Sequence, residues 1–381
     1  MQNSYNNLIR FYLFILCAGQ IRQVLEALGL TSPFIRVINV YGVYIFYPIL
    51  LCIVVISSKA TFKVGHLVLY SFLIGYPCLT LGYFYDVPYS PQYRLTDVLM
   101  PMFFFLTIAF ARTSSLDFGF IFKTRWLQAY LVVSTVSILT ALQFDIRYHS
   151  LASVQLLFLF SYYFYHKSFF TKYLVVFDIF LSGKRGLLVF VFSLISKLKF
   201  IQIMLVCVGV FVFVEFGLSP GKYINSLSLI GEVSFLEFLG ARGKEISEVV
   251  FQLENEPLAF YTGFGSGFYY IITDSSGFIK FAHNVHFSPL GLISTYGVVY
   301  CVISYAFLIR MYVNSQKANP IFSMYLFLGL LYSLTAYSIF VDFLLLVSLC
   351  GIQNSKDRMS LSNYTQRATL LGRPGVSQIK A

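Results

Sequence analysis

Charged residues are scarce in this chain, and the short motifs of several enzyme classes are missing from it. Only 11% of its 381 residues are charged, against about one quarter in ordinary soluble domains, and 58% are hydrophobic. No HExxH or Walker-type pattern occurs, which argues against a zinc peptidase or an ATPase. These absences favour an integral membrane protein over a soluble enzyme.

Paired cysteines are also missing. The six cysteines lie singly inside apolar runs, and none forms a CxxC pair. Neither a structural zinc site nor a disulfide framework is therefore implied, and we expect no metal and no cofactor. We interpret these residues as small packing side chains: Cys17, Cys52, Cys78, Cys207, Cys301 and Cys350.

Long apolar runs are what the chain does contain. A hydrocarbon core of about 30 Å requires about 20 apolar residues per helical span. We therefore predict an all-α polytopic membrane protein of about twelve spans, and we expect the first run to be a span rather than a cleaved signal peptide. The predicted spans lie near residues 8–28, 37–57, 64–84, 95–111, 126–143, 150–166, 169–181, 186–196, 200–216, 284–309, 321–337 and 339–352.

Lysine and arginine recur in every second loop between these spans, as expected of cytoplasmic loops. The formal net charge of +11 is thus assigned to topology rather than to nucleic-acid binding. One long polar stretch, 217–283, carries four cations and seven acids and is predicted to be a large external loop. Both termini are then cytoplasmic, and residues 353–381 form a disordered tail after a transmembrane domain spanning 1–352.

Two cationic elements are candidates for binding an anion. Residues 182–186 read Ser-Gly-Lys-Arg-Gly between the two short apolar segments at 169–196, as in helices that break around a polar site. The guanidinium of Arg185, next to Lys184, matches phosphate oxygens, although a loop cation that snorkels from the membrane is the alternative. Arg242 lies near the predicted start of a short external helix, where backbone amides favour an anion, or is a solvated charge paired with Glu245.

A third element combines glycines with a histidine. Gly263, Gly265 and Gly267 do not have dinucleotide-binding spacing, and we expect a turn whose backbone approaches another surface closely. His283 and Asn284 follow where apolar sequence resumes. His283 is a candidate general base or hydrogen-bonding partner of a sugar hydroxyl, although a lone histidine at a helix start is more often structural.

The order of these three elements resembles the bacterial O-antigen polymerase and ligase superfamily, the Wzy-like and WaaL-like proteins. Residues 181–188 are similar to its S-R-G element, with Lys184 where the family often has serine. Its large periplasmic loop has an early arginine and a P-L-x-G-x-G-x-G stretch, which residues 257–267 resemble with a longer gap. The loop ends in His-Asn before a span with a glycine, as 283–297 do here. The resemblance covers about 120 residues of the chain, 181–300.

This resemblance implies a metal-independent, GT-C-like glycosyltransferase of the bacterial inner membrane, with its active site facing the periplasm. Its substrates would be oligosaccharides on undecaprenyl pyrophosphate, and a chain-length regulator, a flippase and membrane lipid would be partners. By the same resemblance, Arg185 and Arg242 would bind the pyrophosphate, and His283 would orient or deprotonate the attacking hydroxyl. Further substrate contacts are predicted at Lys184, Asn284, Gly263, Gly265, Arg147 and Arg94.

Three functions remain open from the sequence. A polymerase would transfer the growing glycan onto the next lipid-linked repeat unit, and it is the reading we favour because the loop is modest and the motif degenerate. A ligase would transfer the finished glycan to lipid A core. A lipid-linked oligosaccharide flippase belongs to another class, and it is disfavoured because no internal repeat is visible.

Overall fold

Helices make up most of the structure, a computed structural model that describes residues 1–30, 33–59, 62, 64–80, 85–111, 113–117, 120, 125–143, 241–273, 279–283, 285, 287–318 and seven single positions between 323 and 340. In chain order the elements are α1 (Gln2–Ala27), α2 (Pro33–Ser57), α3 (Val64–Leu79), α4 (Pro91–Ala111), α6 (Arg125–Gln143), α13 (Ala241–Asn255), α14 (Pro257–Thr262), β1 (Tyr270–Thr273), β2 (Ile279–Ala282) and α15 (Ser288–Ala318). The two strands pair antiparallel, with Tyr270 opposite Ala282.

Three of the described helices are long and apolar enough to cross a membrane. They comprise Gln2–Glu26, Tyr93–Ala111 and Ser288–Gln316, and shorter apolar helices occupy Ile45–Ser57 and Val64–Leu79. Several helices of the chain could therefore cross a membrane, as the composition predicts. The total of twelve spans stays a prediction, because the segments at 150–216 and 341–352 and the tail 353–381 lie outside the described residues.

The predicted spans coincide with helices wherever both are described, but several ends differ. α3 ends at Leu79 rather than at 84. α4 begins at Pro91 rather than at 95, since proline fits the first turn of a helix, where no amide partner is needed. α1 extends back to Gln2 through polar residues that hydropathy excluded.

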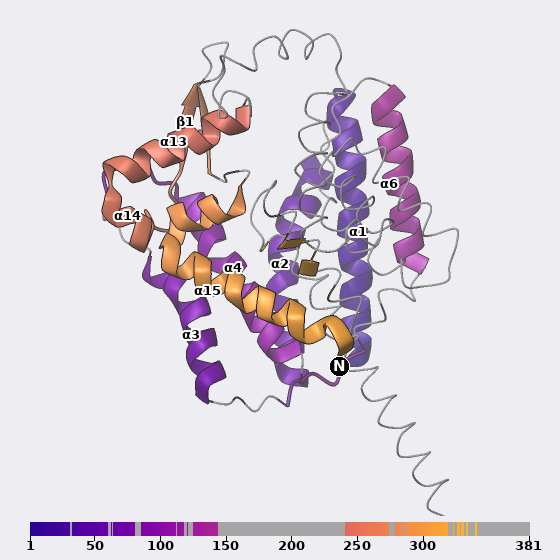
Figure 1. The fold of residues 1–381 in the computed structure, drawn as a ribbon. Helices are drawn as coiled ribbons and strands as arrows, with labels where there is room; N and C mark the ends of the chain where they lie inside the picture. Colours follow the sequence, from indigo (N-terminus) through magenta and orange to yellow (C-terminus); the bar gives the residue numbers. More distant parts are fainter. Residues whose placement is uncertain are drawn as a thin grey trace, which may run out of the picture.

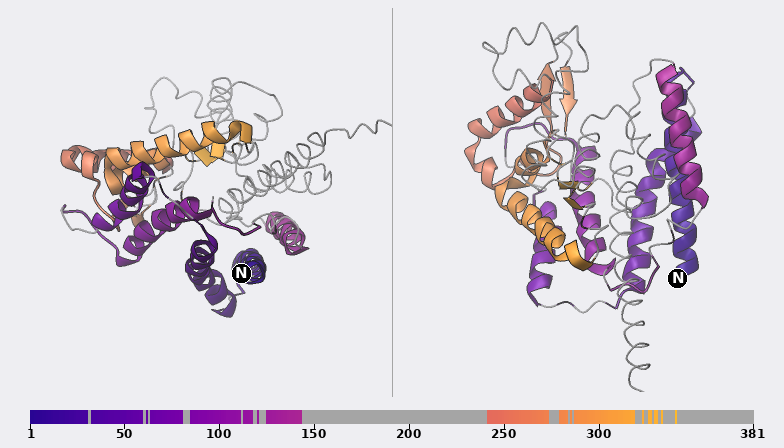
Figure 2. Two further views of the ribbon diagram at one scale, coloured as in Figure 1. Left: turned by 90° about the horizontal axis from the view of Figure 1, so that it is seen from below. Right: turned by 45° about the vertical axis from the view of Figure 1, so that its right-hand side comes forward.

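The described helices form two groups that meet at α4 (Figure 1). α1 packs against α2 and α6, whereas α3 packs against α4 and α15, and α4 also contacts α2. The view from below separates the same two groups (Figure 2). Aromatic rings fill the space between elements, including Phe105 of α4 and Phe307 of α15, whose centroids lie 5.6 Å apart.

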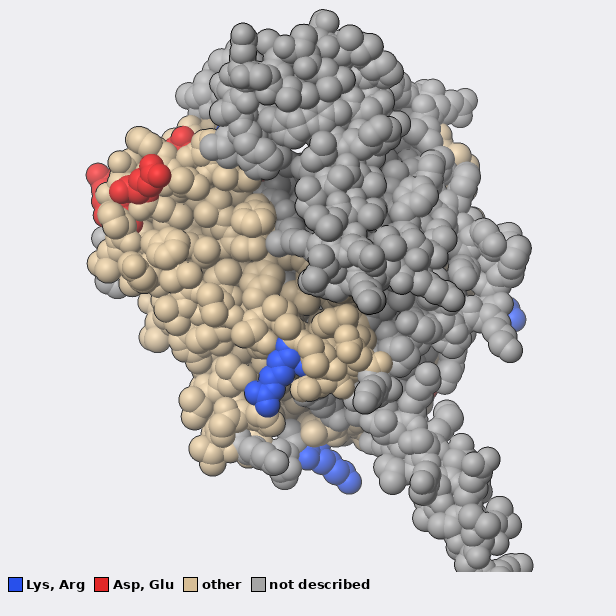
Figure 3. Space-filling view, viewed as in Figure 1, with Lys and Arg blue, Asp and Glu red and all other residues tan. Residues whose placement is uncertain are grey.

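The N-terminus and the segment made of α13 and the β-hairpin lie at opposite ends of the molecule (Figures 1 and 2). Acidic side chains gather over α13 at one end, whereas the basic side chains visible on this face lie toward the other (Figure 3). α13 contains Glu245, Glu248 and Glu254, as counted for the predicted external loop. On this face the visible acidic and basic side chains of the described residues therefore lie apart, while the membrane side of each end stays a prediction.

Two prolines inside helices leave carbonyl groups without helical partners, and two tyrosines of α15 supply the missing donors. Proline lacks an N–H, so the residue four positions earlier loses its helical hydrogen bond. Pro77 of α3 frees the carbonyl of Leu73, which accepts a hydrogen bond from Tyr300 Oη at 2.9 Å. Likewise, Pro101 of α4 frees the carbonyl of Asp97, which accepts one from Tyr296 Oη at 2.6 Å. These pairs fix α15 against α3 and α4.

Tyr300→Phe is expected to lower the free energy of unfolding by about 1 to 3 kcal/mol, because it leaves the buried Leu73 carbonyl unsatisfied. SDS-induced unfolding in mixed micelles measures this loss. The matched background is Pro77→Ala, in which the amide of residue 77 can again bond to Leu73. There the same tyrosine substitution should cost much less. An equal loss in both backgrounds would show that the hydroxyl acts on something other than this carbonyl.

Candidate functional site

The turn at 263–268 lies against a break in α15. Gly297 interrupts that helix with a φ of 85° and a ψ of 165°. The amide of Phe264 donates to the carbonyl of Ser294 at 2.7 Å, and the amide of Gly265 donates to that of Thr295 at 3.0 Å. Polar backbone exposed by a broken membrane helix needs such partners, because no water satisfies it in an apolar setting.

The backbones of the turn and of α15 touch at two glycines. A Cβ at Gly297 would overlap the carbonyl of Tyr261, and a Cβ at Gly263 would overlap that of Thr295. Gly263, Gly265, Gly267 and Gly297 all have positive φ values. The close approach predicted for the turn is thus confirmed, and α15 is the surface that it approaches.

The other side of the turn binds the connection between α3 and α4. Ser266 donates from its amide to the Thr80 carbonyl at 2.9 Å and from its hydroxyl to the Pro77 carbonyl at 3.0 Å. The amide of Ser90 donates to the carbonyl of Gly267 at 2.8 Å. Residues 263–268 therefore join α3, α4 and α15 and are buried, so this part of the predicted loop belongs to the packed structure.

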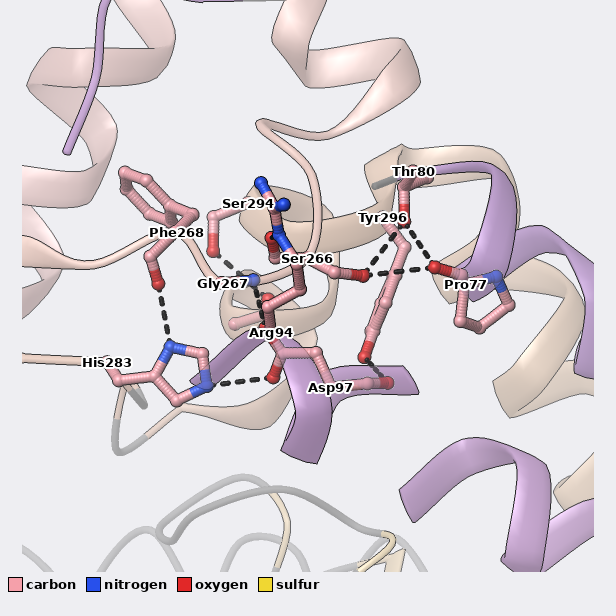
Figure 4. Close-up of polar contacts among 11 residues, drawn as sticks. Pro77, Thr80, Arg94, Asp97, Ser266, Gly267, Phe268, His283, Ser294 and Tyr296 are labelled. Atoms are coloured by element: carbon pink, nitrogen blue, oxygen red, sulfur yellow. Dashed lines mark hydrogen bonds and ion pairs between the residues drawn. The ribbon is translucent and has the colours of Figure 1, made fainter. Parts of the chain in front are cut away.

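His283 lies beside this turn and forms an ion pair or hydrogen bond with Asp97 of α4 (Figure 4). Its Nε2 lies 2.7 Å from Asp97 Oδ1, and its Nδ1 lies 2.7 Å from the carbonyl oxygen of Phe268. The second carboxyl oxygen of Asp97 accepts the amide of Gly267 at 2.7 Å. The exposed fractions are 5% for the His283 side chain and 9% for that of Asp97, so both groups are enclosed.

The hydrogen-bond partners of His283 limit where the protons of the His283–Asp97 pair can lie. A carbonyl oxygen can only accept, so His283 Nδ1 carries a proton. Nε2 then donates to an Asp97 carboxylate, or accepts from an Asp97 carboxylic acid. In either form one proton lies between the two side chains.

Burial by itself would lower the pKa of His283, but its hydrogen bond and charge interaction with Asp97, together with the Phe268 carbonyl, raise that pKa above the ordinary 6.5. A group whose pKa is raised in the folded state stabilises that state most below its unfolded pKa. The stabilisation by His283 is therefore fully present below pH 6.5 and is lost as the pH rises through the raised folded pKa.

Aromatic rings and one arginine complete the surroundings of His283. The ring of Tyr93 stacks on the imidazole, with centroids 4.3 Å apart and an interplanar angle of 3°. Tyr269 contacts Tyr93, and Phe281 contacts Tyr269, both edge-on. Arg94 points to the turn, where its Nε donates to the Ser266 carbonyl at 3.4 Å (Figure 4).

The structure places some of the predicted site residues and leaves others outside its described part. Gly263, Gly265, Arg94 and His283 come together as described above. Arg94 lies in the first turn of α4 and not, as predicted, in a short loop, because α4 begins at Pro91. Arg242 is the second residue of α13, so the predicted helix start is confirmed for its backbone. The predicted residues outside the described part are Arg147, Lys184, Arg185 and Asn284.

The roles predicted for these residues stay predictions. The amide of Gly265 bonds to Thr295 and that of Gly263 to Ala259, so both are occupied in this state. Among the described residues, no three side chains of histidine, cysteine, aspartate or glutamate come together as metal ligands.

Asp97 is the site residue that the sequence interpretation missed. Its signal was present, since it is an acidic residue within the predicted span 95–111, and ionisable groups within spans usually have a partner or a function. The partner itself could not be read from the sequence, because His283 lies 186 positions away.

The chain matches no protein-family model, no curated protein and no solved structure. Its function is therefore argued from its own residues and their arrangement.

Proposed function

We propose that this protein is a membrane-embedded polymerase of a bacterial surface polysaccharide. It transfers a growing glycan from undecaprenyl pyrophosphate to a hydroxyl of the next lipid-linked repeat unit. The observation that carries the proposal is the contact between two parts of the third sequence element. His283 donates to the carbonyl of Phe268, the last residue of the glycine turn, so two segments 15 positions apart are in contact beside the break in α15.

The chemistry requires little beyond positioning and charge. The acceptor oxygen forms a bond to the anomeric carbon, the bond from that carbon to the pyrophosphate oxygen breaks, and the hydroxyl proton passes to the departing pyrophosphate. Arg185 and Arg242 are the proposed groups that neutralise the pyrophosphate as it leaves. Pyrophosphate is a good leaving group, so orientation of the two substrates supplies most of the acceleration.

Of the two roles proposed for His283, orientation agrees better with its contacts than direct removal of a proton. Both ring nitrogens already have partners within 2.7 Å. A general base needs a free nitrogen within hydrogen-bonding reach of the hydroxyl. His283 would have to exchange Asp97 or Phe268 for the substrate to act in that way.

Purified protein with lipid-linked repeat units alone tests the polymerase directly. A ladder of glycan lengths supports it. Product that forms only after lipid A core is added would indicate the ligase instead.

The two arginines give the sharpest mutational test of the proposed chemistry. Arg185→Ala and Arg242→Ala are each expected to reduce long glycan at least about 100-fold, since each removes charge stabilisation at the leaving group. Arg185→Lys should also be strongly impaired, because one ammonium cannot replace a planar two-pronged donor. Glycan ladders normalised to membrane-inserted protein measure this. The matched control is Arg310→Ala. Arg310 lies in the part of α15 that follows the break at Gly297, away from the glycine turn, so its loss should leave the ladder unchanged.

A flippase for lipid-linked oligosaccharide is the second candidate, and the buried Asp97–His283 pair is the observation that favours it. Acidic and histidine side chains form proton relays in membrane transporters, and here Asp97 lies in α4 whereas His283 lies between β2 and α15. A deletion strain separates the two functions. Loss of a polymerase leaves single repeat units exported, whereas loss of a flippase leaves carrier-linked sugar facing the cytoplasm.

A further inference from the structure

We infer that Asp97 is a positioning residue of this site, which binds His283 and the glycine turn simultaneously and holds one proton between its carboxyl group and the imidazole. The effect of Asp97 on catalysis rests on the proposed polymerase function. The proton held between Asp97 and His283 is independent of that function.

The contacts of the two carboxyl oxygens carry the inference. Oδ1 faces His283 Nε2 and Oδ2 faces the Gly267 amide, each at 2.7 Å. Asp97 therefore binds a side chain from after β2 and a backbone amide from the turn, although it belongs to neither segment. An enclosed carboxyl group is costly unless it is paired and hydrogen-bonded, and here both oxygens have donors.

The groups around the pair leave the imidazole with one fixed orientation. Tyr93 covers one face of the ring, and the Phe268 carbonyl holds Nδ1. Tyr296 donates to the backbone carbonyl of Asp97 and so fixes the helix turn that carries the carboxyl group. The Arg94 guanidinium faces the Ser266 carbonyl of the same turn. Asp97 thus determines both the position of the ring and whether it can be cationic.

The consequence for the proposed reaction is indirect. With Asp97 present, His283 keeps its proton as the pH rises and lies fixed beside the turn. Without the carboxyl group, the imidazole would keep only its Nδ1 proton and would be neutral. Asp97 is therefore expected to influence the rate through the charge and orientation of His283 rather than by touching the substrate.

Asp97→Asn is the discriminating variant, because asparagine has the same shape. Its amide nitrogen can donate to Nε2 of a neutral imidazole, and its oxygen can still accept the Gly267 amide. The packing and both hydrogen bonds are retained, whereas the titrating proton is removed. The matched control is Asp86→Asn, the same change at an exposed position of the α3–α4 connection.

The first measurement is independent of activity. In 15N-histidine NMR of the full-length protein, the His283 signal is assigned by its loss in His283→Gln. In the wild type we expect the Nδ1 signal of a protonated nitrogen. We also expect the Nε2 signal to show the proton shared with Asp97 at every pH from acid to mildly alkaline. In Asp97→Asn, His283 should be neutral with a protonated Nδ1 throughout. An unprotonated Nδ1 in the wild type, or an unchanged His283 signal in Asp97→Asn, would overturn the inference even if polymerisation is confirmed.

The second measurement is chain extension by the purified protein. Asp97→Asn should lower kcat at least about 10- to 100-fold with little change in KM, the loss that follows when a carboxylate orienting a metal-bound histidine is removed. The dependence of kcat on pH should change as well, which loss of a purely structural contact would not cause. Wild-type kcat with an unaltered pH profile would refute the positioning role. Absence of polymer with the wild-type protein would refute the proposed function instead, and the NMR result would stand.

Discussion

Gly297→Ala is expected to abolish accumulation of folded protein in the membrane. A methyl group at this position would overlap the carbonyl of Tyr261, and the backbone has a φ of 85° and a ψ of 165°, a conformation restricted almost entirely to glycine. Strain and overpacking together should cost about 4 kcal/mol or more. Relief would require moving α14 away from the break in α15, which would separate Gly263 from Thr295 as well.

The measurement is the yield of monodisperse protein after extraction, followed by its melting temperature in detergent. Gly75→Ala in α3 is the matched control, since a methyl group there would meet nothing within 4 Å. That substitution should leave the yield unchanged and the stability equal or slightly higher, because alanine restricts the unfolded chain. Wild-type yield and melting of Gly297→Ala would show that the helix break and its contact with the turn are not features of the folded protein.

Asp97→Ala is expected to lower the free energy of unfolding by about 3 to 5 kcal/mol. The substitution leaves His283 Nε2 and the Gly267 amide without their acceptor in an enclosed environment. It also removes the contact of Asp97 with the turn, so the ladder of glycan lengths should be lost together with stability. SDS-induced unfolding gives the first quantity, and glycan ladders give the second.

His283→Ala in the same background shows whether the two side chains act as a pair. The double variant should be less destabilised than the sum of the single variants by about 1 to 3 kcal/mol, because removing both partners leaves fewer unsatisfied groups. Asp86→Ala combined with His283→Ala provides the additive reference. Strict additivity of the Asp97 and His283 effects would argue that their contact contributes nothing specific to the fold.

Much of the helical architecture followed from composition and periodicity, because a hydrocarbon environment constrains a spanning segment to about 20 apolar residues. Hydropathy located α1, α2, α3, α4, α6 and α15, although not their ends. The difference at the first turn of α4 is the most important one for the site, because that turn contains Arg94. A window based on apolar residues excluded Arg94, whereas Pro91 at the first helical position was the better indicator of where the helix begins.

The candidate site was predicted only in part. The glycine spacing predicted a close approach of the backbone, and His283 was selected because it follows the polar stretch. Asp97 was not selected, since a single acidic residue within a span gives no information about its partner. Nor did the sequence indicate that Tyr296 and Tyr300 would bond to carbonyls freed by Pro101 and Pro77.

The sequence by itself determined that this is a mostly helical, apolar chain with one polar stretch, because local hydrophobicity decides which segments avoid water. Only the tertiary structure decided that residues 263–268 pack against α4 and α15 and that His283 is hydrogen-bonded to Asp97. The contact between Asp97 and His283 joins positions 186 residues apart, and its formation depends on how the helices pack. Hence the glycine turn and His283, which the sequence predicts to belong to an external loop, pack directly against the helices in the structure.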